Sequence, residues 1–310
     1  MPPRLARLLA VVAAVALVVG AFVLRGVISG DDDGIDGPGV PLVRWKVVCD
    51  ADLGEACERL ESFPGIEEVK VLAAGEVLGP GEGSDPLAGF DLWITLDPIA
   101  DVVGGHATTP AGDSKPVASA SLAVVLRPEG GCDDPAPWDC LLAAGRNPFG
   151  LPDLDSSTGI VTAGAALIGL AGSDAPSRRD VNEHSGTLAE AEFDDLDGLT
   201  DDIYLPGRLS GIATPAAIAN AVVGTSRGGS EGLGAFDIVD SPTIGVVVTP
   251  LRDEPDVVGG AEEVAAEILG RDGEQNVLDA LAEAGFADGP QRSSGLPAPD
   301  VMYALWEELS

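Results

Sequence analysis

Short apolar runs alternate with amphipathic, helix-like segments along most of the chain. Strands are expected at 43–49, 68–74, 92–96, 119–126, 236–239 and 245–249. Helices are expected at 52–63, 98–103, 160–170, 215–223, 261–285 with a break at 270–273, and 299–309. The acidic stretch 194–202 is expected to be a solvated loop. This alternation predicts an α/β fold.

The N-terminal part predicts a membrane segment followed by a tether. Residues 8–24 are apolar apart from Gly20; they follow Arg4 and Arg7 and precede Arg25. Such a stretch is long enough to cross a bilayer, and the basic flank places the N-terminus in the cytoplasm. We therefore expect a cytoplasmic tip (1–7), one transmembrane helix as a single-pass signal anchor in the cell membrane (8–29), an acidic Gly/Pro linker (30–41) and an extracellular main domain. A cleaved signal peptide is the alternative.

The charge balance restricts the partners of the protein. The chain has 51 acidic and 17 basic residues, which gives a formal net charge of −34. A chain this anionic is repelled by phosphate backbones, so nucleic acid is not expected as a partner.

Four cysteines fall as two pairs with equal spacing. An even number of cysteines in an exported chain favours disulfides. We expect the local pairs Cys49–Cys57 and Cys132–Cys140, because a short turn from strand to helix brings such partners within bonding distance. The spacing does not match a zinc ribbon, and both histidines lie far from any cysteine, so no metal site is expected.

Four stretches together resemble a known family. They are residues 47–60, 90–97, 150–159 and 261–286. In this order and spacing they are similar to the extracellular solute-binding proteins of ABC importers, with the type II periplasmic-binding-protein-like fold that includes molybdate and sulfate binders. The resemblance implies two α/β lobes around a ligand cleft. The lobes would be 42–120 with 242–310, and 121–241, with the chain crossing near 119–122 and 240–243.

The candidate site lies where strand ends and helix starts would face the cleft. Helix N-termini expose unpaired N–H groups, which can hold a small ligand at the carboxyl ends of strands. The candidate ligand-binding residues are Asp50, Asp52, Gly75, Glu76, Ser156, Ser157, Thr158, Arg227 and Asp240. Several of these, such as Asp52 and Ser156, are equally ordinary helix caps.

The acidic residues around the candidate site restrict the charge of the expected ligand. Asp50 and Asp52 from one wall, and Asp153 and Asp155 from the other, would stand where an anion must sit. Two like charges about 4 Å apart repel by about 4 kcal/mol at an effective dielectric constant near 20. An oxyanion is therefore disfavoured, and a neutral or cationic solute is expected unless Arg227 compensates.

These observations predict a membrane-anchored, extracellular solute-binding protein, the binding component of an ABC-type importer. A small-molecule ligand, a possible permease partner, no cofactor and no enzymatic activity are expected. The alternative is a ligand-less structural or sensor module of the cell envelope with the same fold. A hydrolase is disfavoured, because the two Gly-x-Ser-x-Gly patterns within 224–232 follow a helix, whereas a nucleophile elbow follows a strand.

Overall fold

Strands covered by helices build the part of the chain that the structure describes. The computed structural model describes residues 44–79, 85–104, 110–128, 131–143, 147–225, 232–270 and 277–310. Val43–Ser310 form one compact unit. The expected membrane segment and linker, and Arg227, lie outside the described residues. Within the described ranges, no helix has both the length and the apolar character to cross a membrane.

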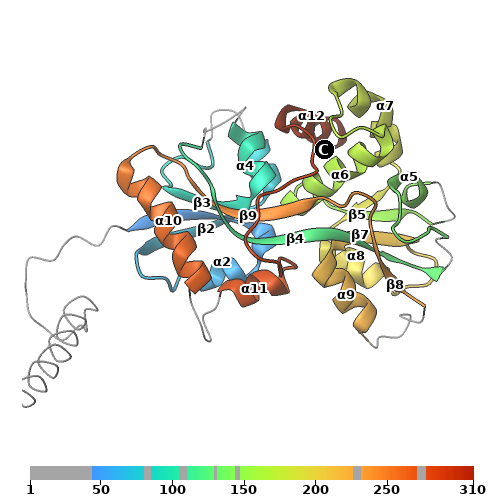
Figure 1. Ribbon diagram of the computed structural model, residues 1–310, viewed down its shortest axis with the longest axis horizontal. Helices are drawn as coiled ribbons and strands as arrows, with labels where there is room; N and C mark the ends of the chain where they lie inside the picture. Colours follow the sequence, from blue (N-terminus) through green and yellow to red (C-terminus); the bar gives the residue numbers. More distant parts are fainter. Residues whose placement is uncertain are drawn as a thin grey trace, which may run out of the picture. The chain divides into compact units, whose positions relative to one another are not determined.

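The first sheet builds the first lobe (Figure 1). Its strand order is β2-β1-β3-β9-β4, with β1 parallel to β2 and β3, and β9 antiparallel to β3 and β4. Its strands are β1 (Trp45–Asp50), β2 (Ile66–Leu72), β3 (Leu92–Leu96), β9 (Thr243–Pro250) and the first half of β4 (Lys115–Leu126). The central strands β1 and β3 are almost wholly buried, as their continuous apolar runs predict.

The second sheet builds the second lobe. Its order is β4-β7-β5-β6, and β8 pairs with β4. The added strands are β5 (Phe149–Pro152), β6 (Glu192–Asp194), β7 (Gly211–Pro215) and β8 (Gly234–Asp237). β5 runs parallel to β6 and β7, so the carboxyl ends of these strands point to one edge of the sheet.

The long strand β4 joins the two lobes. Ser121 pairs with Thr243 of β9 in the first sheet, whereas Leu122 pairs with Pro215 of β7 in the second. The chain returns to the first lobe between β8 and β9. The lobes are therefore joined by strands that run across the molecule, and a change in their relative orientation must bend these strands.

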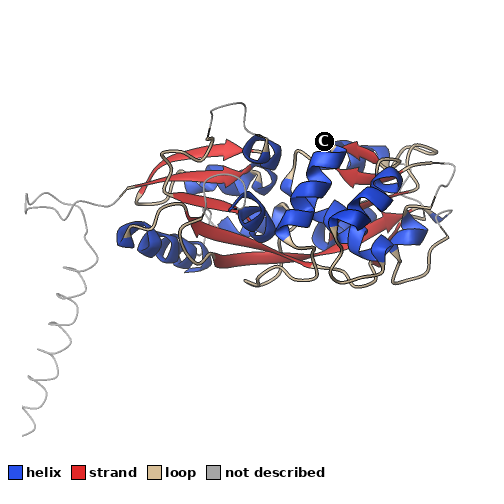
Figure 2. Cartoon of the chain, turned by 90° about the horizontal axis from the view of Figure 1, so that it is seen from above, coloured by secondary structure: helices blue, strands red, loops and turns tan. Residues whose placement is uncertain are grey.

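Helices cover both sheets, and the last helix packs against helices of both lobes. The first lobe carries η1 (Ala51–Leu53), α2 (Glu55–Leu60), α3 (Ala74–Leu78), α4 (Asp97–Gly104), α10 (Pro255–Gly270) and α11 (Val277–Glu283). The second lobe carries α5 (Trp138–Leu141), α6 (Ser157–Ala171), α7 (Arg178–Leu188), α8 (Leu196–Asp202) and α9 (Ala216–Gly224). The last helix, α12 (Pro299–Leu309), packs against α4 and also against α6 and α7 (Figures 1 and 2). The family resemblance assigns this helix to the first lobe.

Most of the acidic stretch 194–202 is helix α8 and not the predicted loop, while Asp194 ends β6. Asp195 caps α8 by accepting a hydrogen bond from the backbone N–H of Gly198 at 2.7 Å. Acidic residues in a first helical turn are favourable because they face the positive end of the helix dipole. Leu199 is fully buried on the inner face. The charges that suggested a loop are those that a helix start favours.

The apolar core continues from one lobe into the other. The largest cluster of buried side chains includes β1 and β3 of the first lobe and α6 of the second. As predicted, α6 is a buried helix that packs through small residues, because an added Cβ at Gly169 would lie 2.3 Å from the Trp138 ring. A second, smaller cluster lies under α8 and α9.

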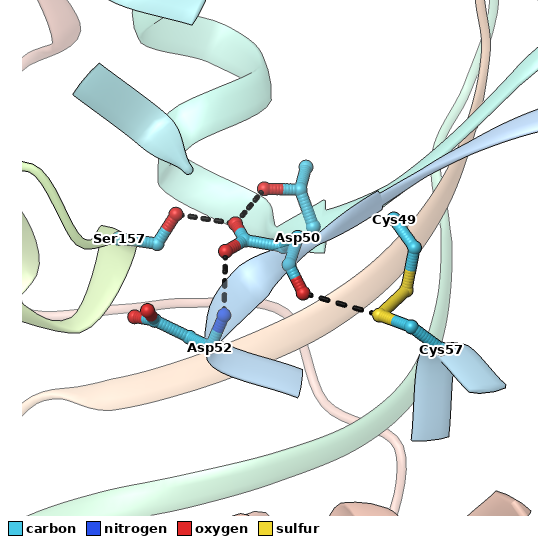
Figure 3. Close-up of a disulfide and its surroundings, with 6 residues drawn as sticks. Cys49, Asp50, Asp52, Cys57 and Ser157 are labelled. Atoms are coloured by element: carbon cyan, nitrogen blue, oxygen red, sulfur yellow. Dashed lines mark hydrogen bonds between the residues drawn. A yellow bond between two sulfur atoms is a disulfide. The ribbon is translucent and has the colours of Figure 1, made fainter. Parts of the chain in front are cut away.

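Both predicted disulfides are present. Cys49 at the end of β1 is bonded to Cys57 in α2, and Cys132 is bonded to Cys140 in α5. The first bond fastens the turn that follows β1, beside the candidate site (Figure 3).

Candidate functional site

Asp50, the last residue of β1, is the most buried carboxylate of the candidate site, with 1 % of its surface exposed. The strand ends here because the Asp50 side chain turns back to cap η1, accepting a hydrogen bond from the Asp52 N–H at 3.1 Å. An aspartate is well suited to this position, since its short side chain can bond the backbone two residues later.

The Asp50 carboxylate also joins the two lobes (Figure 3). Its Oδ2 atom accepts a hydrogen bond from Thr95 Oγ1 of β3, in the same lobe, at 2.6 Å. The same oxygen accepts a hydrogen bond from the hydroxyl of Ser157, the first residue of α6 in the other lobe. The Thr95 and Ser157 side chains are fully buried. The contact between the lobes at this point is therefore direct and excludes a solute.

Two further hydrogen bonds connect the lobes beside Asp50. The Thr158 N–H donates to Asp52 Oδ2 at 2.6 Å. The Gly75 N–H donates to the backbone carbonyl of Asp155 at 2.9 Å. The start of α6 thus faces two carboxylates from the first lobe, while Ser156 caps the helix by accepting from the Gly159 N–H at 2.9 Å.

Burial changes the acidity of both carboxyl groups. Loss of water contact, reinforced by the negative charge of Asp52, raises the pKa of Asp50 to about 7. The hydrogen bonds from Ser157, Thr95 and the Asp52 N–H oppose this rise but do not cancel it. Burial also raises the pKa of Asp52, against the hydrogen bond from Thr158.

A cavity of about 690 Å³ lies next to these contacts, between the lobes. Its walls come from the start of α2 and from α11 on one side, and from 152–158, α8 and α9 on the other. Seven lining residues are acidic, and none of the described lining residues is basic. The acidic ones are Asp52, Glu55, Asp153, Asp155, Asp195, Asp197 and Glu283. The volume is in the range of small-molecule sites.

A second cavity of about 440 Å³ extends the first. Both are lined by Leu196, Asp197, Ile218 and Glu283, so they form one groove between α8, α9 and α11. The extension has fewer acidic residues, Asp197 and Glu283, and α9 contributes the apolar residues Ala221 and Val222 to its wall. Acidic residues are therefore denser in the first cavity, and the α9 wall of the groove is apolar.

The structure brings some of the predicted site residues together and leaves others apart. Six of them lie at the contact between the lobes or in the cavity wall: Asp50, Asp52, Gly75, Ser156, Ser157 and Thr158. Glu76 is exposed and accepts a hydrogen bond from the Ala73 N–H, so it caps α3 and does not line the cavity. Asp240 lies in an exposed turn with a φ of 53° and does not line it either.

Other residues of the site were missed by sequence reasoning. Thr95 stands in the middle of an apolar strand, where threonine is an ordinary β-residue, so no signal marked it. Asp195 and Asp197 follow β6, whose carboxyl end lies at the same edge as that of β5. Recognition of 192–194 as a parallel strand would have pointed to them.

The described acidic residues are not arranged as a metal site. In the ranges that the structure describes, no three or more His, Cys, Asp or Glu side chains come together as they would around a metal ion. The carboxylates are instead spread over the cavity wall.

Comparison with known proteins identifies the fold to which this architecture corresponds. No protein-family model and no curated protein sequence matches the chain. A periplasmic binding protein from Actinobacillus pleuropneumoniae with bound fructose-6-phosphate is similar in structure, with a TM-score of 0.55 and 13 % identity over 86 % of this chain and 94 % of that one. The protein has the fold of periplasmic solute-binding proteins.

Two more structures with this fold illustrate its range. A putative spermidine/putrescine ABC transporter protein from Listeria monocytogenes has a TM-score of 0.53 and 14 % identity, over 84 % of each chain. A periplasmic thiamin binding protein has a TM-score of 0.51 and 13 % identity, over 89 % of this chain and all of the other. The expected resemblance to binding proteins of ABC importers is thus confirmed for the fold.

Proposed function

We propose that the protein is the extracellular solute-binding component of an ABC-type importer and that it captures a small organic cation. The observation that carries the proposal is the cavity between the lobes, with seven acidic residues and no basic residue among the described lining residues. A cation in this cavity relieves the repulsion between the carboxylates, whereas an anion adds to it. The protein acts by binding, without covalent chemistry.

An organic cation fits the cavity better than a metal ion. The carboxylates are dispersed, and the groove continues into an apolar wall formed by α9. A molecule with ammonium groups and a hydrocarbon chain matches both the carboxylates and the apolar wall. One of the similar structures bears the description "putative spermidine/putrescine ABC transporter", which supports this class of ligand.

The tether and the permease belong to the same proposal. The segment 8–29 would anchor the N-terminus in the cell membrane, and 30–41 would let the lobes reach a permease. A retained anchor keeps the binding protein near its partner, which raises the effective concentration of the pair.

Calorimetric titration with putrescine tests the proposal. We expect binding to the parent chain, and binding weaker by about 10- to 150-fold in Asp197→Asn and in Glu283→Gln, since a hydrogen bond to a charged group contributes about 1.5–3 kcal/mol. Glu307→Gln removes the same charge from α12, outside the cavity, and is the matched control. Absence of binding by putrescine, spermidine and thiamin alike would contradict the proposal.

A second candidate is a structural or sensor module of the cell envelope that has lost its ligand. The core that continues between the lobes and the direct contact of Asp50 with Ser157 favour it. This candidate predicts that no small molecule raises the melting temperature, and that the lobes keep one fixed orientation.

A further inference from the structure

Two carboxylates of the first lobe, Asp50 and Asp52, lie at the start of α6, where a bound anion would sit at a helix N-terminus. The first N–H groups of an α-helix lack intrahelical partners, and the helix dipole places partial positive charge there. Anions collect at such ends. At the start of α6, the Ser157 hydroxyl donates a hydrogen bond to Asp50 and the Thr158 N–H donates one to Asp52. Carboxylates of the first lobe therefore already accept hydrogen bonds from both of these donors.

Asp50 is held in the same way as a bound anion would be held. Its carboxylate is buried and accepts hydrogen bonds from three elements: β3, α6 and the backbone of η1. Among the described residues, no ion pair with a basic side chain reaches Asp50 or Asp52. Hydroxyl and N–H donors from both lobes therefore hold the carboxylate, and it holds both lobes.

From this geometry we infer that Asp50 is a built-in replacement for an anionic ligand. Its carboxylate latches the first lobe to the start of α6, and it keeps free anions out of the cleft. The inference deepens the proposed function, on which it rests for the role of the cleft. It assigns solute to the acidic cavity beside the latch, and it makes closure of the lobes independent of an anion.

We call the hydrogen bonds from Thr95 and Ser157 to the Asp50 carboxylate the latch. Its role can be tested by measuring the distance between the lobes in the full chain. Spin labels at Leu205→Cys in the second lobe and Leu269→Cys in the first are suitable, because these side chains are 54 % and 43 % exposed. Double electron–electron resonance then compares Asp50 with two replacements. Asp50→Asn keeps an oxygen that can accept from Thr95 and Ser157. Asp50→Ala removes the acceptor and leaves room for formate.

We expect the parent and Asp50→Asn to give one short distance and Asp50→Ala to shift to longer distances. Formate is expected to restore the short distance in Asp50→Ala and to leave the parent unchanged. The inference is overturned if Asp50→Ala keeps the distance of the parent, or if formate does not shorten its longer distance.

A second variant covers the case in which Asp50→Ala does not fold. Thr95→Val with Ser157→Ala keeps Asp50 but removes both side-chain donors, at little change in volume. A longer distance in this variant supports the latch, and an unchanged distance overturns it. Failure of putrescine, spermidine and thiamin alike to bind the parent would contradict the proposed function but would leave these distances as they are, so the two failures are distinguishable.

Discussion

The Asp50 side chain has two structural roles: it caps η1, and it accepts a hydrogen bond from the other lobe. It does both from a fully buried position. Burial without a cation makes the charged form costly, and hydrogen bonds only partly offset the cost. Its neutral form is therefore favoured to a higher pH than that of an ordinary aspartate. This is a property of the position, because a surface aspartate such as Asp180 has a lowered pKa.

The raised pKa of Asp50 predicts a pH-dependent stability. The pKa rises from 3.8 to about 7 on folding, so between these values the folded protein retains a proton that the unfolded chain has lost. The contribution to the free energy of unfolding is complete below pH 3.8 and is lost as the pH rises to about 7. We expect this loss to be about 2–4 kcal/mol in the parent and absent in Asp50→Asn.

Urea unfolding followed by circular dichroism at a series of pH values measures this effect. Other carboxyl groups titrate in the same range, so the informative quantity is the difference between the parent and Asp50→Asn at each pH. Parallel pH curves for the two proteins would show that Asp50 does not take up a proton on folding.

At the scale of elements, the approach of α3 to the second lobe depends on the absence of a side chain at Gly75. An added Cβ would lie 2.4 Å from Asp155 Oδ1 and 3.1 Å from its Cα. The carboxylate can move away, but the backbone resists. We expect Gly75→Ala to lower the free energy of unfolding by about 1–3 kcal/mol, measured by urea denaturation.

Gly186→Ala is the matched control for this substitution. Gly186 lies inside α7, and an added Cβ meets no atom within 4 Å. Alanine is favoured over glycine in a helix by about 0.5–1 kcal/mol, so this variant should be more stable than the parent. If both alanine variants gain stability, the close contact between Gly75 and Asp155 is not present in solution.

Comparing the two disulfides distinguishes a general effect on stability from a local effect on ligand binding. Both close a loop with a sequence separation of 8, so the chain-entropy model assigns each about 2.5 kcal/mol of stability. Only Cys49–Cys57 fastens the turn that carries Asp50 and Asp52. We expect either Cys→Ala pair to lower the melting temperature by a similar amount, but only the first to weaken putrescine binding. Equal effects on binding would contradict this role of the turn.

Elements with a strong local signal could be predicted from the sequence. The apolar run 92–96 is β3, and the amphipathic segment 299–309 is α12. The short strands β5, β6 and β7 were not predicted, because three to five residues carry too little periodicity. The stretch 194–202 was misread since acidic residues suit both a loop and a helix start.

The sequence could predict the parts of the candidate site that follow from local structure, but not the contacts between the lobes. Asp50, Asp52 and 156–158 were found because carboxyl ends of strands and helix starts meet at one edge of a sheet. The bond between Asp50 and Ser157 spans 107 positions in sequence and depends on how closely the lobes approach, which no local pattern encodes. For the same reason, capping by Glu76 and the outward position of Asp240 could not be predicted.

At the scale of the whole molecule, the net charge of −34 acts on folding and on binding. Like charges repel in the compact state, and this repulsion falls as salt shortens the screening length to about 10 Å at 0.1 M. Salt also screens the attraction between the acidic cavity and a cation. The two effects have opposite signs, because one is a repulsion within the protein and the other an attraction to the ligand.

We therefore expect added sodium chloride to raise the melting temperature of the unliganded protein and to weaken putrescine binding in the same concentration range. Scanning calorimetry measures the first effect and isothermal titration the second. Sucrose at matched osmolality is the control, since it stabilises folded proteins without screening charge and should leave the affinity unchanged. An affinity that does not respond to sodium chloride would show that the carboxylates of the cavity do not attract the ligand. Binding would then depend on the apolar part of the groove.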